Sequence, residues 1–220
     1  MRFAACSPRM TPSSARSWSS TVASLRKASD GCLAGGREAF GHFERYVNLL
    51  FCLTVAHGDA AIHLSRNRSQ PLGAVLTGGH DPRGRPVVRL ADGRFLRLVT
   101  RVRLDPSSGG ALRVDTQSWQ YQTAMGDDSW VFRADYSRAR SAAARSPSGH
   151  LHVHGSLRQP AALRAKQPLG RVHFPCRHPT LEAVVVLLAD EFGVPTNAPH
   201  DVWRAAVAEH EAKSARLFDL

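Results

Sequence analysis

The chain has no apolar run long enough to cross a membrane, few lysines and no paired cysteine motif. No 18 consecutive residues are apolar, and the most apolar segment, 46–56, is interrupted by Asn48 and Thr54. We therefore expect no membrane span. The four cysteines lack C-x-x-C spacing, which excludes the common paired zinc motifs. Lysine occurs only at positions 27, 166 and 213, so arginine carries nearly all of the positive charge.

Several familiar catalytic and targeting patterns are also absent. The sequence has no Walker pattern, dinucleotide glycine fingerprint, G-x-S-x-G or H-E-x-x-H. These absences disfavour nucleotide hydrolases, Rossmann enzymes, α/β-hydrolases and zincins. The N-terminal segment lacks the apolar core of a secretory signal, so we expect a cytoplasmic protein. We expect residues 1–17 to form a disordered basic arm, although its composition also resembles a transit peptide and Met10 is an alternative start.

Acidic residues are missing from the whole segment between Tyr136 and Leu181. The same segment contains eight basic residues: Arg138, Arg140, Arg145, Arg158, Arg164, Lys166, Arg171 and Arg177. The formal net charge of the chain is +11, which favours a polyanionic partner such as nucleic acid. The alternative is that a GC-rich genome has enriched the chain in arginine without a binding role.

The periodicity of apolar residues changes along the chain and predicts an α+β fold. We expect helices over about 20–66, broken at the glycines near 31–36, and a loop over 67–86. Strands are expected at 86–104 (a hairpin turning at Asp92-Gly93), 111–123, 129–137, 150–155 and 171–174. Two helices should follow, at 180–192 with Thr180 as N-cap and at 201–216.

The predicted architecture is an antiparallel meander-like sheet of five or six strands, flanked by N-terminal and C-terminal helices. We divide the chain into the basic arm (1–17), a helical N-terminal region (18–66) and an α+β domain (67–220).

Three histidines at two-residue spacing are the most informative pattern in the sequence. His150, His152 and His154 lie between Gly149 and Gly155. Because alternate side chains of a strand point to the same face, the three imidazoles should line one side of the sheet. Histidines in this arrangement predict a divalent metal site, with zinc or manganese as the ion.

A carboxylate and a guanidinium are expected beside these histidines. In the strand 129–137, Asp135 and Arg133 should face away from the apolar side chains. If this strand pairs with the histidine strand, Asp135, His152 and His154 would form a catalytic centre in which Arg133 binds phosphate. The centre would work with a metal ion or by metal-free acid/base chemistry. The alternative is that the histidines only decorate the polar face of a sheet.

Two further groups of residues are candidate functional sites. His173, Cys176 and His178 form a second possible ligand cluster, or else a strand end followed by a loop with a buried thiol. Trp119 and Tyr121 alternate with glutamines, which is typical of a base-stacking surface or, more commonly, of the core side of a strand.

The order of the predicted strands and the helix that follows them resembles that of known protein families. The segments Phe132-Arg-Ala-Asp-Tyr136, His150-Leu-His-Val-His-Gly155, Val172-His-Phe-Pro175 and the helix beginning Thr180-Leu-Glu resemble a family of uncharacterised actinobacterial proteins. More loosely, they are similar to the TumE-type toxin-like proteins of toxin–antitoxin modules. This resemblance covers about a third of the chain and implies the domain layout, together with a toxin-like role.

Three functional hypotheses follow. The first is a protein that binds and cleaves nucleic acid through Asp135, His152, His154 and Arg133. The second is a non-enzymatic interaction protein, whose acidic C-terminal part docks on the basic sheet or meets an acidic protein partner. That part contains Glu182, Asp190, Glu191, Asp201, Glu209, Glu211 and Asp219. The third is a metal-dependent hydrolase of a small molecule.

Overall fold

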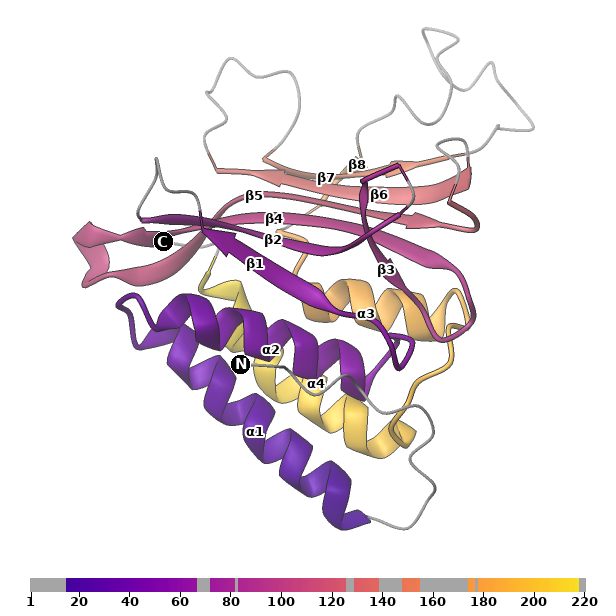
Figure 1. Cartoon of the computed structure of the whole chain (residues 1–220), viewed down its shortest axis with the longest axis horizontal. Coiled ribbons are helices and arrows are strands. Elements are labelled where there is room, and N and C mark those ends of the chain that lie inside the picture. Colours follow the sequence, from indigo (N-terminus) through magenta and orange to yellow (C-terminus); the bar gives the residue numbers. More distant parts are fainter. Residues whose placement is uncertain are drawn as a thin grey trace, which may run out of the picture.

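The structure, a computed structural model, describes residues 15–66, 72–81, 83–125, 129–138, 148–154, 174–176 and 178–217. Within these residues, four helices lie on one face of an antiparallel sheet (Figure 1). The predicted α+β class is therefore confirmed. The predicted number of strands is wrong, because the sheet has eight strands, the last of only two residues, rather than five or six.

The strands lie across the sheet in chain order: β1 (Ile62–Arg66), β2 (Gly73–His80), β3 (Pro86–Arg89), β4 (Phe95–Asp105), β5 (Ala111–Gln122), β6 (Trp130–Ser137), β7 (Gly149–Val153) and β8 (Phe174–Pro175). β2 also pairs with β4, because the short β3 reaches only the last two residues of β2. The predicted hairpin at Asp92-Gly93 is present, and Gly93 has a φ of +84°, which favours glycine.

The two strands that the sequence did not predict are β1 and β2. β1 falls in a segment expected to be helical, and β2 falls in the expected loop 67–86. In β2, Ala74, Leu76 and Gly78 alternate inward, but three glycines hide that alternation in the sequence. A Cβ on Gly78 would lie 2.4 Å from the carbonyl oxygen of Val87, so the close approach of β3 requires glycine here.

The helices are α1 (Ala15–Leu33), α2 (Ala39–Leu53), α3 (Leu181–Asp190) and α4 (His200–Ala215). The hydroxyl of Thr180 accepts a 3.2 Å hydrogen bond from the Ala183 amide, which confirms the predicted N-cap. α1 begins inside the expected basic arm, since residues 15–17 are helical; residues 1–14 lie outside the described part of the chain.

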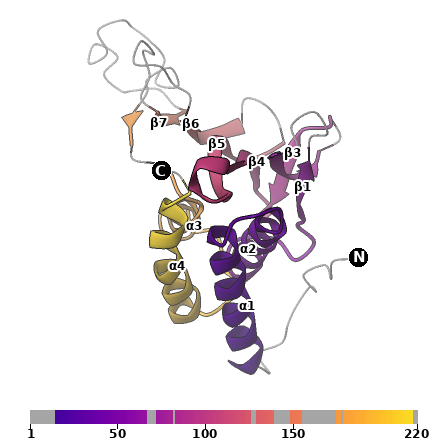
Figure 2. The same cartoon turned by 90° about the vertical axis from the view of Figure 1, so that its left-hand side faces the viewer.

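A single hydrophobic core lies between the helices and the sheet. Leu25 of α1, Leu50 of α2, Tyr121 of β5 and Trp203 of α4 are all buried in it. The predicted helical region 18–66 therefore packs into the same core as the following residues. Figure 2 shows α1 with α2 and α3 with α4 as two pairs under the sheet. No helix among the described residues is long and apolar enough to span a membrane.

Candidate metal centre

The histidine strand pairs with the strand that carries Asp135, as the sequence predicted. β6 and β7 are antiparallel, with Asp135 directly opposite His150 and Arg133 directly opposite His152. Phe132 and Ala134 of β6 are buried in the core, so the alternation of the strand places Arg133 and Asp135 on the other face. We call the face that points away from the helices the outer face.

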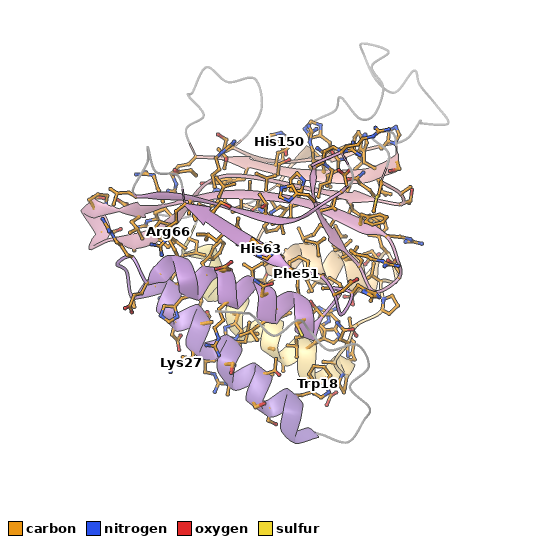
Figure 3. All side chains as sticks on the ribbon, viewed as in Figure 1. Trp18, Lys27, Phe51, His63, Arg66 and His150 are labelled. Atoms are coloured by element: carbon orange, nitrogen blue, oxygen red, sulfur yellow. The ribbon has the colours of Figure 1, made fainter. Side chains whose placement is uncertain are left out.

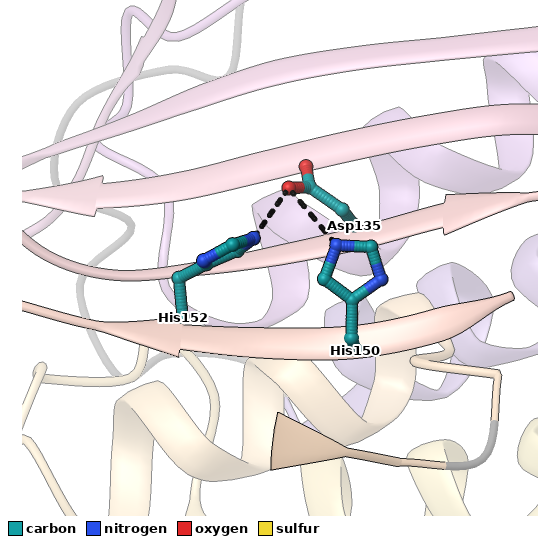
Figure 4. Close-up of side chains that lie close together, drawn as sticks. All are labelled: Asp135, His150 and His152. Carbon is teal, nitrogen blue, oxygen red and sulfur yellow. Dashed lines mark ion pairs between the residues drawn. The ribbon is translucent and has the colours of Figure 1, made fainter. Parts of the chain in front are cut away.

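Three side chains converge on the outer face (Figure 4). The Nε2 atoms of His150 and His152 lie 3.8 Å and 3.5 Å from Oδ2 of Asp135. The imidazole rings are 5.0 Å apart between centroids and meet edge to face. Figure 3 places His150 on the side of the sheet away from α1, which carries Trp18 and Lys27.

The geometry of these three residues fits an ion better than direct hydrogen bonds. Both Nε2–Oδ2 distances exceed the usual 2.7–3.2 Å range of an N–H···O bond. Ligand atoms about 2.1 Å from a tetrahedral zinc ion lie about 3.4 Å from one another. Within the described part of the chain, Asp135, His150 and His152 form the one group of three such residues close enough to hold a metal ion, with ligand atoms within 4.8 Å of one another.

Burial and the neighbouring arginine fix the orientation of these ligands. The His150 and His152 side chains are 2% and 6% exposed, whereas that of Asp135 is 19% exposed. Nε of Arg133 donates a 2.8 Å hydrogen bond to Oδ2 of Asp135. This bond orients the carboxylate from outside the cluster, as hydrogen-bond partners of metal ligands commonly do. Arg133 has further N–H donors, so it can also bind an anion beside the cluster.

His154 does not join the cluster of three possible ligands, so the structure does not place it where its predicted role as a metal ligand requires. It follows the last residue of β7 and is exposed. Its ring stacks on Trp130 with centroids 4.7 Å apart, and its Nδ1 lies 2.9 Å from the Trp130 carbonyl oxygen. The two-residue spacing predicted the shared face, but the third imidazole is directed to a neighbouring aromatic ring instead.

Further basic residues lie on the same outer face. Arg97 of β4 is opposite Gln120 of β5, and Gln120 is opposite Arg133, so these side chains continue the row that ends at His152. Arg101, four residues further along β4, is exposed and has no ion pair within the described residues. Arg103 pairs with Asp115 at 2.7 Å. The sequence did not single out Arg97 or Arg101, because their proximity to β6 depends on the pairing of β4 with β5.

The other predicted candidates have structural roles or lie outside the described residues. Trp119 and Tyr121 are buried in the core, and the Trp119 indole donates to Thr100, so neither is a stacking surface. Cys176 is an exposed free thiol, and the His178 ring packs edge-on against Tyr136. His173 lies outside the described part of the chain, as do residues 139–147 of the basic linker.

A cavity of about 700 Å³ borders the opposite face of the same two strands. Phe132, Ala134 and Leu151 line it from the sheet, and Val184 and Leu187 line it from α3. Cys176 and His178 of the second candidate cluster also line it, whereas Asp135, His150 and His152 do not, because they point to the outer face. This cavity and the cluster of Asp135, His150 and His152 are therefore on different sides of the sheet.

The sequence also did not reveal a polar cluster inside the helical layer. Glu182 of α3 is fully buried, and the Tyr46 hydroxyl donates a hydrogen bond to its Oε1. Burial raises the pKa of Glu182 to about 8. His210 of α4 is also fully buried and packs edge-on against Tyr46, and burial lowers its pKa. Glu182 looked like an ordinary first-turn acidic residue, since nothing local signals that α4 covers it.

No family model, curated protein or solved structure matches this chain. The resemblance to the actinobacterial family and to TumE-type proteins therefore stays a prediction.

Proposed function

We propose that the outer face carries a divalent-metal centre that cleaves phosphodiester bonds of nucleic acid. The observation that carries this proposal is the convergence of Asp135, His150 and His152, with Nε2–Oδ2 distances of 3.5 and 3.8 Å. Arg133 beside them supplies a cationic group for a phosphate oxygen.

The ligand set suits a catalytic ion. Two imidazoles and one carboxylate are a common set of protein ligands in catalytic zinc sites, where the fourth position is left to water or substrate. The partial exposure of Asp135 leaves a side from which a substrate oxygen can approach. Zinc suits two nitrogen ligands best, and manganese suits the carboxylate and water oxygens.

The reaction that this centre supports is hydrolysis without oxidation or reduction. Asp135, His150 and His152 would hold the ion, which would lower the pKa of a water molecule and so supply hydroxide near neutral pH. The hydroxide oxygen forms a bond to phosphorus, and the bond from phosphorus to the leaving sugar oxygen breaks. That oxygen takes up the proton that the water released. Arg133 neutralises charge on the phosphoryl oxygens as the new bond forms.

The charge distribution favours nucleic acid over a small phosphate ester. The chain has a formal net charge of +11, and Arg97, Arg101 and Arg133 lie on the same face as the cluster. Guanidinium groups that lie beyond the reacting phosphate can bind the further phosphates of a polynucleotide. A metal-dependent hydrolase of a small molecule remains the alternative within this class.

The test compares His152 of β7 with His154, which follows the last residue of that strand. Elemental analysis of tag-free protein should find close to one zinc or manganese per wild-type chain, none in His152→Ala, and a full complement in His154→Ala. Asp135→Asn, which keeps the side-chain shape, should also lose the metal. A labelled RNA and DNA panel should be cleaved by the wild type and not by His152→Ala, while their circular dichroism spectra stay the same.

Metal-free wild-type protein, or a His152→Ala variant that keeps its metal and activity, would refute the proposal. Salt-sensitive self-association of a metal-free protein would favour the non-enzymatic alternative with an acidic partner. Among the described residues, Glu209 of α4 pairs with Arg26 of α1, and both helices lie on the other side of the sheet from the outer face.

A further inference from the structure

An aromatic pair lies on the outer face next to the metal centre. Trp130 and His154 are stacked with an angle of 20° between their rings, and the His154 ring is exposed. A bulge brings Trp130 to this face: Tyr121 is opposite Phe132, whereas the next residue, Gln122, is opposite Trp130. Val131, the extra residue, packs against the core beside Phe132.

Guanidinium groups and aromatic rings occur in two neighbouring rows across this part of the sheet. Arg89 of β3 is opposite Phe95 of β4, Phe95 is opposite Gln122, and Gln122 is opposite Trp130. The adjacent row contains Arg97, Gln120, Arg133 and His152. We call the set of Arg89, Phe95, Arg97, Trp130 and His154 the stacking surface. Arg97 lies in the row that contains Arg133 and His152, and the row of Arg89, Phe95 and Trp130 is the next one on the same face.

We propose that the stacking surface binds single-stranded nucleic acid, with a base stacked on the imidazole of His154 and backbone phosphates on Arg97 and Arg89. Proteins that bind single strands combine basic grooves with aromatic side chains on which bases stack. A duplex cannot use this surface in the same way, because its bases are already stacked on one another. The inference deepens the proposed function, on which its cleavage step rests, by naming single strands as the substrate class.

His154 is suited to this role because its ring is held in place. Trp130 supports one face of the imidazole, and Nδ1 is within hydrogen-bond distance of the Trp130 carbonyl oxygen. A ring that is already ordered loses less conformational freedom when a base stacks on it. This also gives the third histidine of the sequence pattern a role that does not need metal coordination.

The experiment measures fluorescence anisotropy of a labelled oligothymidylate and of the same strand in a duplex. Wild-type protein should bind the single strand more tightly than the duplex at equal salt. His154→Ala should weaken single-strand binding about tenfold, in line with the loss of one base–aromatic stack. His154→Phe should restore most of the affinity, because it keeps an aromatic ring.

The matched control is His200→Ala. His200 is also exposed and also packs against a tryptophan, Trp203, with ring centroids 5.5 Å apart, but it lies on α4 in the helical layer. This variant should bind like the wild type. Equal binding of single strand and duplex, or equal losses in His154→Ala and His200→Ala, would overturn the inference.

The two proposals fail in different ways. Binding does not require cleavage, so single-strand preference in a protein without metal would refute the metal centre and keep the stacking surface. A metal-loaded protein that cleaves both single strands and duplexes, and that loses no affinity in His154→Ala, would support the metal centre and refute the stacking surface.

Discussion

Asp135 and His150 face each other across β6 and β7, and Oδ2 of Asp135 lies 3.8 Å from Nε2 of His150. Side chains that are directly opposite on one face of an antiparallel pair have their Cβ atoms about 5 Å apart. His152, two residues along β7, reaches the same oxygen diagonally. The cluster is therefore a product of strand register, and a slip of one residue would move the histidines to the core face.

Added metal should stabilise the wild-type fold if this cluster binds it. An ion that binds only the folded state at a hundredfold excess over its Kd adds about 2.7 kcal/mol to the free energy of unfolding. For a chain of this size, that corresponds to a rise in Tm of about 5–10 °C. Thermal unfolding with zinc, with manganese and with a chelator measures the effect.

Asp135→Asn provides the comparison in the same experiment, since it keeps the volume of the side chain but removes a charged ligand. Its Tm should not respond to either metal. An equal rise in wild type and variant would place the stabilising ion elsewhere in the protein.

Local patterns predicted much of the structure that surrounds the cluster. The alternation of Phe132, Ala134 and Tyr136 predicted which face Asp135 occupies, and the structure confirms it. The predicted pairing of the two strands is also confirmed. The face of Asp135 follows from the two-residue period of a strand, and the pairing agrees with the expected meander order of the strands.

The sequence-based predictions were wrong where contacts between residues distant in the sequence determine the local structure. His154 keeps the strand spacing, but the bulge at Val131 brings Trp130 beside it, and bulges leave no clear signal in the sequence. β2 contains Gly78 because another strand approaches it closely. From the local sequence alone, a glycine at this position predicts a loop. Likewise, Glu182 is buried through contacts between helices that are distant in the sequence, such as the hydrogen bond from Tyr46 of α2.

Gly78→Ala should destabilise the protein, whereas Gly79→Ala should not. A Cβ on Gly78 would lie 2.4 Å from the Val87 carbonyl oxygen, but one on Gly79 would lie 3.8 Å from the same atom. Overpacking of this kind costs about 1–3 kcal/mol. Urea unfolding of both variants measures the difference. Equal stability of the two variants would show that β3 does not approach β2 as closely as described.

Glu182 should make the stability of the protein fall as the pH rises. Burial raises its pKa from 4.5 to about 8 in the folded state. Between these values the folded protein binds more protons than the unfolded chain. This contribution to stability is therefore complete below about pH 4.5 and lost as the pH rises through 8. The slope reaches at most about 1.4 kcal/mol per pH unit.

Glu182→Gln tests this directly, because glutamine resembles the protonated carboxyl group and can still accept the hydrogen bond from Tyr46. Urea unfolding between pH 5 and 8 should show a shallower pH dependence in the variant, which should become the more stable protein at the alkaline end. Glu209→Gln is the control: its carboxylate pairs with Arg26, which lowers its pKa, so this variant should be the less stable one at neutral pH. Parallel pH profiles for wild type and Glu182→Gln would mean that Glu182 is ionised in the folded protein.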